Sequence, residues 1–101
     1  MFQQGTKADA TYREVIVAKV VRVLCDMTSD WDIEFFGEIG PHTHIISDLE
    51  FESIDVVQFI VQIEETFGRK DLPFEKLLMI NGRYRDEMTV QEVVDFLHKH
   101  L

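Results

Sequence analysis

The sequence predicts one all-α domain of four helices, with a long loop between the first two and a short third helix. Two stretches, residues 53–67 and 90–101, carry apolar residues at the three- and four-residue spacing of an amphipathic helix. Capping boxes of the form Thr-x-x-Glu start at Thr11 and Thr89, ahead of the first and last apolar runs. At 101 residues the chain is long enough for a single hydrophobic core.

The first helix is expected from Thr11 to about Met27. Residues 1–8 are expected to be a flexible lead, and residues 9–101 the domain. The β-branched run after Glu14 makes a strand a rival by propensity. Charges at helical spacing, at Lys19, Arg22 and Asp26, favour the helix. Cys25 is the single cysteine, which excludes an internal disulfide, and we expect it to be a small buried hydrophobe.

Residues 28–47 form a long connection in which Gly37, Gly40 and Pro41 interrupt regular structure. A connection this apolar is expected to pack onto the helices. Its apolar members are Trp31, Ile33, Phe35, Phe36, Ile39, Ile45 and Ile46. His42 and His44 lie in the same loop without a recognisable zinc spacing, so no metal site is expected.

The second helix is expected from Ser53 to Phe67, with Gly68 as its C-terminal cap. The helical pattern puts one apolar stripe deepest in the core and a second strip at its edge. The deep stripe is Val56, Ile60, Ile63 and Phe67, and the edge strip is Ile54, Val57 and Val61. Phe59 is expected at the edge of the apolar arc.

Pro73 suits the first turn of a short helix over residues 74–79. Asn81-Gly82 predicts a turn. Arg83 and Arg85 bring positive charge to the segment 80–87, which we interpret as a surface loop with a partner contact as the alternative. The last helix is expected to follow Thr89.

The formal net charge is -9, which argues against binding nucleic acid or anionic membranes and favours a basic protein partner. The N-terminal residues lack the apolar run of a signal peptide, and no run is long enough to span a bilayer. We therefore expect a cytoplasmic protein, and a monomer.

The most informative residue is Ser53, a serine at a helix start within a strongly acidic stretch. A hydroxyl in this position is most often a helix cap. Between residues 48 and 66 there is no lysine or arginine. The acidic residues of the stretch are Asp48, Glu50, Glu52, Asp55, Glu64 and Glu65.

Four blocks of sequence resemble the acyl carrier protein family, in the family's order and over residues 46–100. The first, Leu49 to Gln58, resembles the signature Leu-Gly-x-Asp-Ser-Leu, with Glu50 in place of the glycine and Glu52 in place of the aspartate. The others are residues 64–68, Leu72-Pro73 and residues 88–96, which resemble the end of the family's second helix and the starts of its third and fourth.

The resemblance implies that a phosphopantetheinyl transferase attaches 4′-phosphopantetheine from coenzyme A to Ser53. The protein would then carry acyl groups as thioesters for fatty acid, polyketide or related lipid synthesis, without a catalytic site of its own. Its partners would be acyl-processing enzymes with basic docking surfaces. The expected partner-binding residues are Glu52, Ile54, Asp55, Val57, Val61, Glu64 and Glu65.

Three alternatives remain open from the sequence. The chain could be an aminoacyl or peptidyl carrier of a nonribosomal pathway, or an unmodified helical interaction domain. It could also be a small metal-dependent enzyme using His42 and His44.

The resemblance also implies that a saturated acyl chain can enter between the helices. We expect that space beside the second helix, within a core of Val56, Phe59, Ile60, Ile63, Phe67, Val93 and Val94. The bulk of Phe59 predicts that short or unusual acyl groups are held better than long saturated ones.

Overall fold

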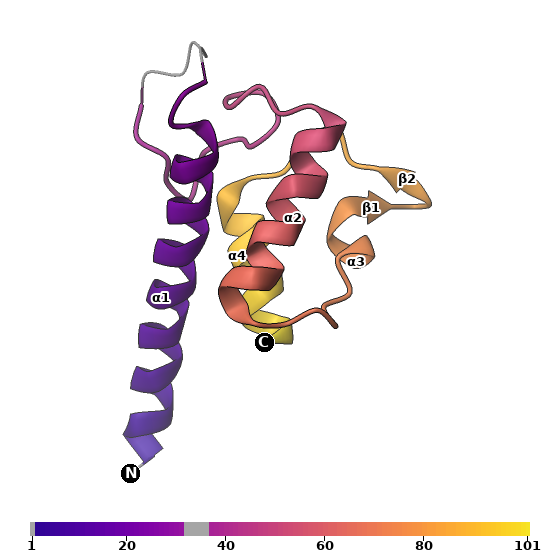
Figure 1. Cartoon of the computed structure of the whole chain (residues 1–101). Helices are drawn as coiled ribbons and strands as arrows, with labels where there is room; N and C mark the ends of the chain where they lie inside the picture. The colour runs from indigo at the N-terminus through magenta and orange to yellow at the C-terminus, as the bar shows by residue number, and fades with distance from the viewer. Residues whose placement is uncertain (1, 32–36) are drawn as a thin grey trace.

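The computed structural model describes residues 2–31 and 37–101, with side chains described from Tyr12 onward. Four helices dominate the fold, which confirms the predicted all-α class (Figure 1). They are α1 (Phe2–Thr28), α2 (Ser53–Phe67), α3 (Glu75–Leu78) and α4 (Val90–His100). A two-stranded hairpin of β1 (Met79–Ile80) and β2 (Arg83–Tyr84) lies between α3 and α4 in the chain.

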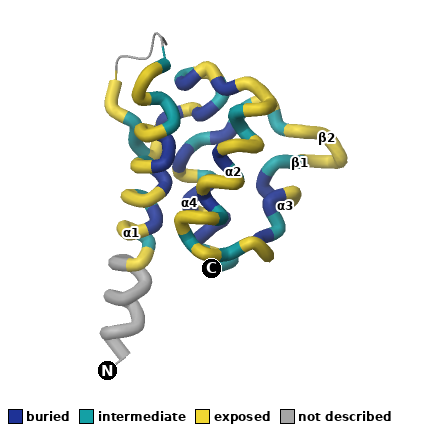
Figure 2. Tube along the Cα trace, viewed as in Figure 1, coloured by how far each residue is buried: buried dark blue, intermediate teal, exposed yellow. Residues whose placement is uncertain are grey.

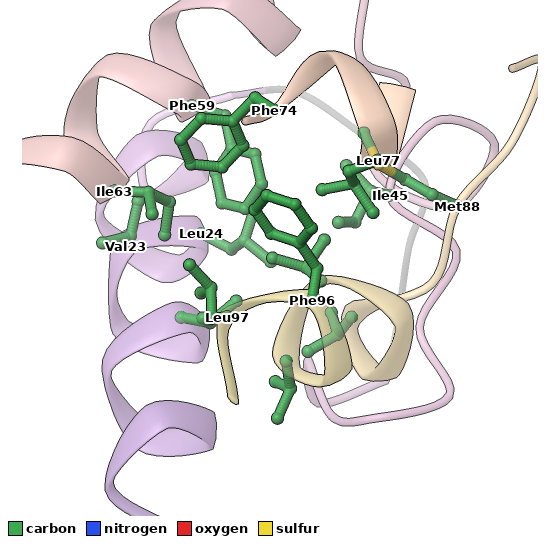
Figure 3. Close-up of a cluster of buried hydrophobic side chains, with 14 of the residues drawn as sticks. Val23, Leu24, Ile45, Phe59, Ile63, Phe74, Leu77, Met88, Phe96 and Leu97 are labelled. Carbon is green, nitrogen blue, oxygen red and sulfur yellow. The ribbon is translucent and has the colours of Figure 1, made fainter. Parts of the chain in front are cut away.

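The core lies where α1, α2 and α4 pack together, with α3 against α4 (Figure 2). Its centre is Phe59, which is completely buried. Figure 3 shows Phe59 among side chains from α1, α3 and α4, including Leu24, Leu77 and Phe96. The prediction that Phe59 lies at the edge of the apolar arc is therefore wrong, because the helices and the loop close over that side of α2.

Helix α1 begins at Phe2, so Thr11 lies inside the helix and is not its cap. Strong helix formers such as Ala8 and Ala10 favour continuation of the helix through this segment. Residues 2–8, expected as a lead, are thus helical, while their mobility stays a prediction. Near the other end, Cys25 is exposed and not buried as predicted, because it falls on the solvent side of α1 next to the exposed Asp26.

The long connection packs against the core, as predicted, through Trp31, Ile39 and Ile45. The Trp31 ring lies 5.2 Å from that of Phe51, and Ile45 is completely buried. The backbone N–H of Ile45 donates to the Met88 carbonyl at 2.9 Å, which ties the loop to the entrance of α4. The predicted contacts of three further apolar residues fall outside the described part of the chain: Ile33, Phe35 and Phe36.

Helix α2 has the predicted bounds and the predicted cap. Gly68 adopts the left-handed conformation, with φ of 67°, and its N–H bonds the carbonyls of Glu64 and Glu65. The three residues of the edge strip are exposed, while Val56, Ile60 and Phe67 of the deep stripe are half-buried. The helical pattern therefore predicted which residues of α2 are exposed better than it predicted which are most deeply buried.

The third helix is shorter than predicted, and a hairpin follows it. Pro73 lies before the N-terminal cap Phe74, so it precedes the first turn of α3. Asn81 and Gly82 both have positive φ, of 54° and 76°. These values are typical of a type I′ turn, whose twist suits a two-residue hairpin. The Asn-Gly turn is thus confirmed, and the strands around it are an addition to the predicted fold.

Helix α4 starts with the predicted capping box. The Thr89 hydroxyl accepts a bond from the Glu92 N–H at 3.2 Å, and the Glu92 carboxylate accepts one from the Thr89 N–H at 2.8 Å. These bonds satisfy backbone donors that a helix start leaves unpaired.

Candidate functional site

Ser53 is the first residue of α2, and it is exposed. The cap position belongs to Glu52, whose backbone is extended at φ of -99° and ψ of 174°. Among the described residues, no hydrogen bond involves the Ser53 hydroxyl. The Ser53 hydroxyl is therefore accessible to solvent at the start of the helix, and it makes no capping hydrogen bond.

The backbone around Ser53 is held from the first turn of α2. The Asp55 carboxylate accepts a bond of 2.8 Å from the Glu52 N–H. Asp55 is the third residue of the helix, so its charge also lies at the positive end of the helix dipole. This bond fixes the peptide between Phe51 and Glu52, one residue before Ser53.

Glu50, three residues before Ser53, has a positive φ of 58°. Glycine adopts this left-handed region without strain, whereas a side chain makes it costly. This is the position at which the family signature has a glycine. The departure noted in the sequence therefore keeps the glycine's backbone conformation while adding an exposed carboxylate.

A pocket of about 680 Å³ opens beside Ser53, between the start of α2 and the segment that joins the hairpin to α4. Ser53 is one of its lining residues. The apolar part of its wall comes from the loop before α2, from α2, from α3 and from the segment before α4: Ile46, Phe51, Val56, Val57, Leu78 and Met88. Tyr84 and the charged residues Glu52, Arg85, Asp86 and Glu87 complete the wall.

Glu87 anchors one side of this pocket to the loop before α2. Its two carboxylate oxygens accept the N–H groups of Ile46 and Ser47, each at 2.8 Å. Partial burial by itself would raise the pKa of Glu87. Hydrogen bonds from the Ser47 side chain and from three backbone N–H groups outweigh it and hold the pKa below the usual carboxyl value. The wall thus carries a carboxylate that is ionised at neutral pH.

Comparison with known proteins decides the family. The model of the family described as "Phosphopantetheine attachment site" matches residues 14–97. The acyl carrier protein of Rubrobacter xylanophilus is 31% identical over 88 residues, which cover 87% of this chain and 94% of that protein. No solved structure matches this chain significantly.

The chain belongs to the acyl carrier protein family. It is a carrier protein, and its cofactor is covalently attached 4′-phosphopantetheine. The residues present fit that group, because an exposed, unbonded serine hydroxyl stands at the mouth of an open pocket. When bound, the cofactor supplies a thiol that can carry an acyl group.

The outer face of this carrier's α2 brings together the residues expected to bind partners. Ile54 is 60% exposed, Val57 56% and Val61 40%, so an apolar strip faces solvent. Glu52 and Glu65 are exposed beside it, while Asp55 and Glu64 are half-buried. We call these seven residues the docking face. An apolar strip with an acidic border is suited to an enzyme surface that combines apolar and basic residues.

The pocket of the carrier shares one residue with the core set that the sequence placed beside the second helix. Of the expected core set, Val56 lines the pocket, whereas Phe59, Ile63, Val93 and Val94 are buried in the packed core. The sequence reasoning missed Tyr84 and Asp86 as pocket residues. The Asn-Gly turn was the available signal, since this dipeptide between apolar runs predicts a hairpin that returns the chain toward α2.

The histidines of the carrier's long loop are both exposed. Among the residues that the structure describes, no three His, Cys, Asp or Glu side chains are grouped so as to hold a metal ion. Within the same residues, no helix combines the length and the apolar character needed to cross a membrane.

Proposed function

We propose that this protein carries acyl intermediates as thioesters on a 4′-phosphopantetheine arm attached to Ser53, for fatty acid, polyketide or related lipid synthesis. The observation that carries the proposal is the Ser53 hydroxyl, exposed at the first residue of α2 and free of hydrogen bonds among the described residues. A phosphopantetheinyl transferase would supply the base that takes the hydroxyl proton. The carrier itself then acts without a catalytic site, in the cytoplasm as expected from the sequence.

The docking face supports the same function, because a carrier has to meet several enzymes and leave each of them. Exposed charge pairs contribute about 0.2 to 1 kcal/mol each, so several together give selective but reversible contact. The partners proposed are the transferase and acyl-processing enzymes with basic surfaces. The absence of lysine and arginine between residues 48 and 66 means that every charged residue of this face is acidic.

The test is incubation with coenzyme A and a broad-specificity phosphopantetheinyl transferase, followed by mass spectrometry of the intact protein. One prosthetic group should be added to the wild type and none to Ser53→Ala. Ser29→Ala is the matched control, since Ser29 is also exposed but directly follows α1, where its hydroxyl donates a hydrogen bond to the Asp26 carbonyl. Addition to Ser53→Ala would overturn the assignment of Ser53.

A further inference from the structure

The pocket beside Ser53 is lined by charged side chains as well as by its apolar wall. Three carboxylates line it, those of Glu52, Asp86 and Glu87, together with one guanidinium, that of Arg85. Glu52 and Asp86 are exposed at the mouth. A cargo inside the pocket would therefore lie close to more negative than positive charge.

The guanidinium group of Arg85 already contacts residues of α3 and α4. Its Nη2 atom donates to the Glu92 carboxylate, and Nη1 lies 3.5 Å from the Leu77 carbonyl. The side chain is 18% exposed. Glu92 is itself held by the Thr89 N–H at the start of α4. Arg85 thus joins the end of the hairpin to α4, and the Glu92 carboxylate neutralises the positive charge of Arg85 when no cargo is bound.

The carboxylates are not neutralised in the same way. Glu87 accepts backbone N–H groups, which satisfy its oxygens but leave its negative charge. Among the described residues, no hydrogen bond or ion pair involves the Asp86 carboxylate. Glu87 is half-buried, so its charge acts more strongly on a nearby ligand than it would in bulk water.

We propose that this pocket selects cargo by charge, accepting acyl groups whose far end is neutral or carries an amino group and excluding those that end in a carboxylate. The proposal rests on Ser53 as the attachment point of the arm. The residues of the pocket wall indicate the class of cargo. An apolar acyl chain would contact Val56, Leu78 and Met88, and a positively charged end would be attracted to Asp86. Amino acids joined through their carboxyl group belong to the accepted class.

The experiment uses three cargoes of similar length on the holo protein: butyryl, 4-aminobutyryl and succinyl groups. Each is joined to the pantetheine through an amide, so that the link does not hydrolyse or cyclise, and loading is verified by intact mass. Amide chemical shifts of Val56, Leu78 and Tyr84 are compared with those of the unloaded holo protein. Butyryl and 4-aminobutyryl should shift these signals about twofold or more beyond succinyl.

Two variants that each remove one negative charge separate the pocket from the overall charge. Asp86→Asn should raise the succinyl shifts toward those of butyryl, and Asp26→Asn, an exposed position on α1 outside the pocket and the docking face, should not. Raising the salt concentration should also narrow the difference between cargoes. Equal effects of the two variants would overturn a role for the pocket charges.

Different results would contradict the proposed carrier site and the proposed selection of cargo by charge. If the transferase adds nothing at Ser53, the proposed carrier site is wrong. If all three cargoes load but succinyl shifts the pocket signals as much as butyryl, the carrier site stands and charge selection is overturned.

Discussion

The Asp55 carboxylate accepts a 2.8 Å hydrogen bond from the backbone N–H of Glu52, the residue directly before Ser53. Asp55→Ala should therefore lower the free energy of unfolding by about 0.5 to 2 kcal/mol, the usual cost of losing such a bond at a helix start. Urea unfolding followed by circular dichroism measures this. Gln58→Ala, on the exposed face of the same helix, is the control. An equal loss in both variants would show that the bond to Glu52 contributes nothing.

Glu50 holds a left-handed backbone conformation that disfavours any residue with a Cβ atom. Glu50→Gly removes about 1 to 2 kcal/mol of strain, which is partly offset by the greater freedom of glycine in the unfolded chain. We expect the unfolding free energy to stay level or rise by up to about 1 kcal/mol. Glu65→Gly, inside α2, should instead lose about 1 kcal/mol. A large loss for Glu50→Gly would show that its side-chain contacts outweigh the strain.

Glu87 predicts a particular dependence of stability on pH. Its pKa in the folded protein lies below the usual 4.5, so its stabilising effect is fully present above that value and is lost as pH falls through the folded pKa. Glu87→Gln should cost about 1.5 to 3 kcal/mol at pH 7, the typical value of hydrogen bonds to a charged group. The difference from wild type should shrink below pH 4.5. Unfolding curves of wild type and Glu87→Gln at pH 7 and below pH 4.5 measure this difference in unfolding free energy. A difference that is the same at the two pH values would contradict the prediction.

The acidic end of the docking face should act in partner encounter more than in folding. Reversing charge in Glu64→Lys/Glu65→Lys should lower kcat/KM of the phosphopantetheinyl transferase about threefold to tenfold at low salt. The unfolding free energy should change by no more than about 0.5 kcal/mol, since neither side chain is buried. The kinetic effect should fade as salt screens the charges. Unchanged kinetics at low salt would remove this end of α2 from the docking face.

Val57 and Phe59 are two residues apart on α2 but belong to opposite sides of it. Val57→Ser should lower kcat/KM of the transferase about five- to thirtyfold, because an exposed apolar contact with a partner is lost while the fold is kept. Phe59→Ala should cost about 3 to 5 kcal/mol of unfolding free energy, since its side chain is completely buried. A large loss of stability in Val57→Ser would place that side chain in the core.

Local signals predicted those parts of the fold that depend on neighbouring residues. The bounds of α2, the cap at Gly68 and the box of Thr89 with Glu92 all follow from interactions within one turn of helix. Ser53 could be singled out because a serine and a run of carboxylates coincide at a helix start.

Long-range packing decided the features that the sequence did not predict. The eight apolar residues of α2 spread around much of the helix, so the helical pattern alone does not show which is most deeply buried. Phe59 is completely buried because α1, α4 and the loop converge there. The exposure of Cys25 likewise depends on which side of α1 meets its neighbours. The pocket required Asp86 and Ser53, which are far apart in sequence, to share one wall.

The hairpin of β1 and β2 closes on its own turn and contributes no side chain to the buried core. Its end is attached to the rest of the fold by the backbone bond from the Arg85 N–H to the Leu78 carbonyl and by the contact of Arg85 with Glu92. Residues 80–84 can therefore be exchanged as a cassette. A changed sequence there would alter the pocket wall at Tyr84 while the buried core keeps its side chains.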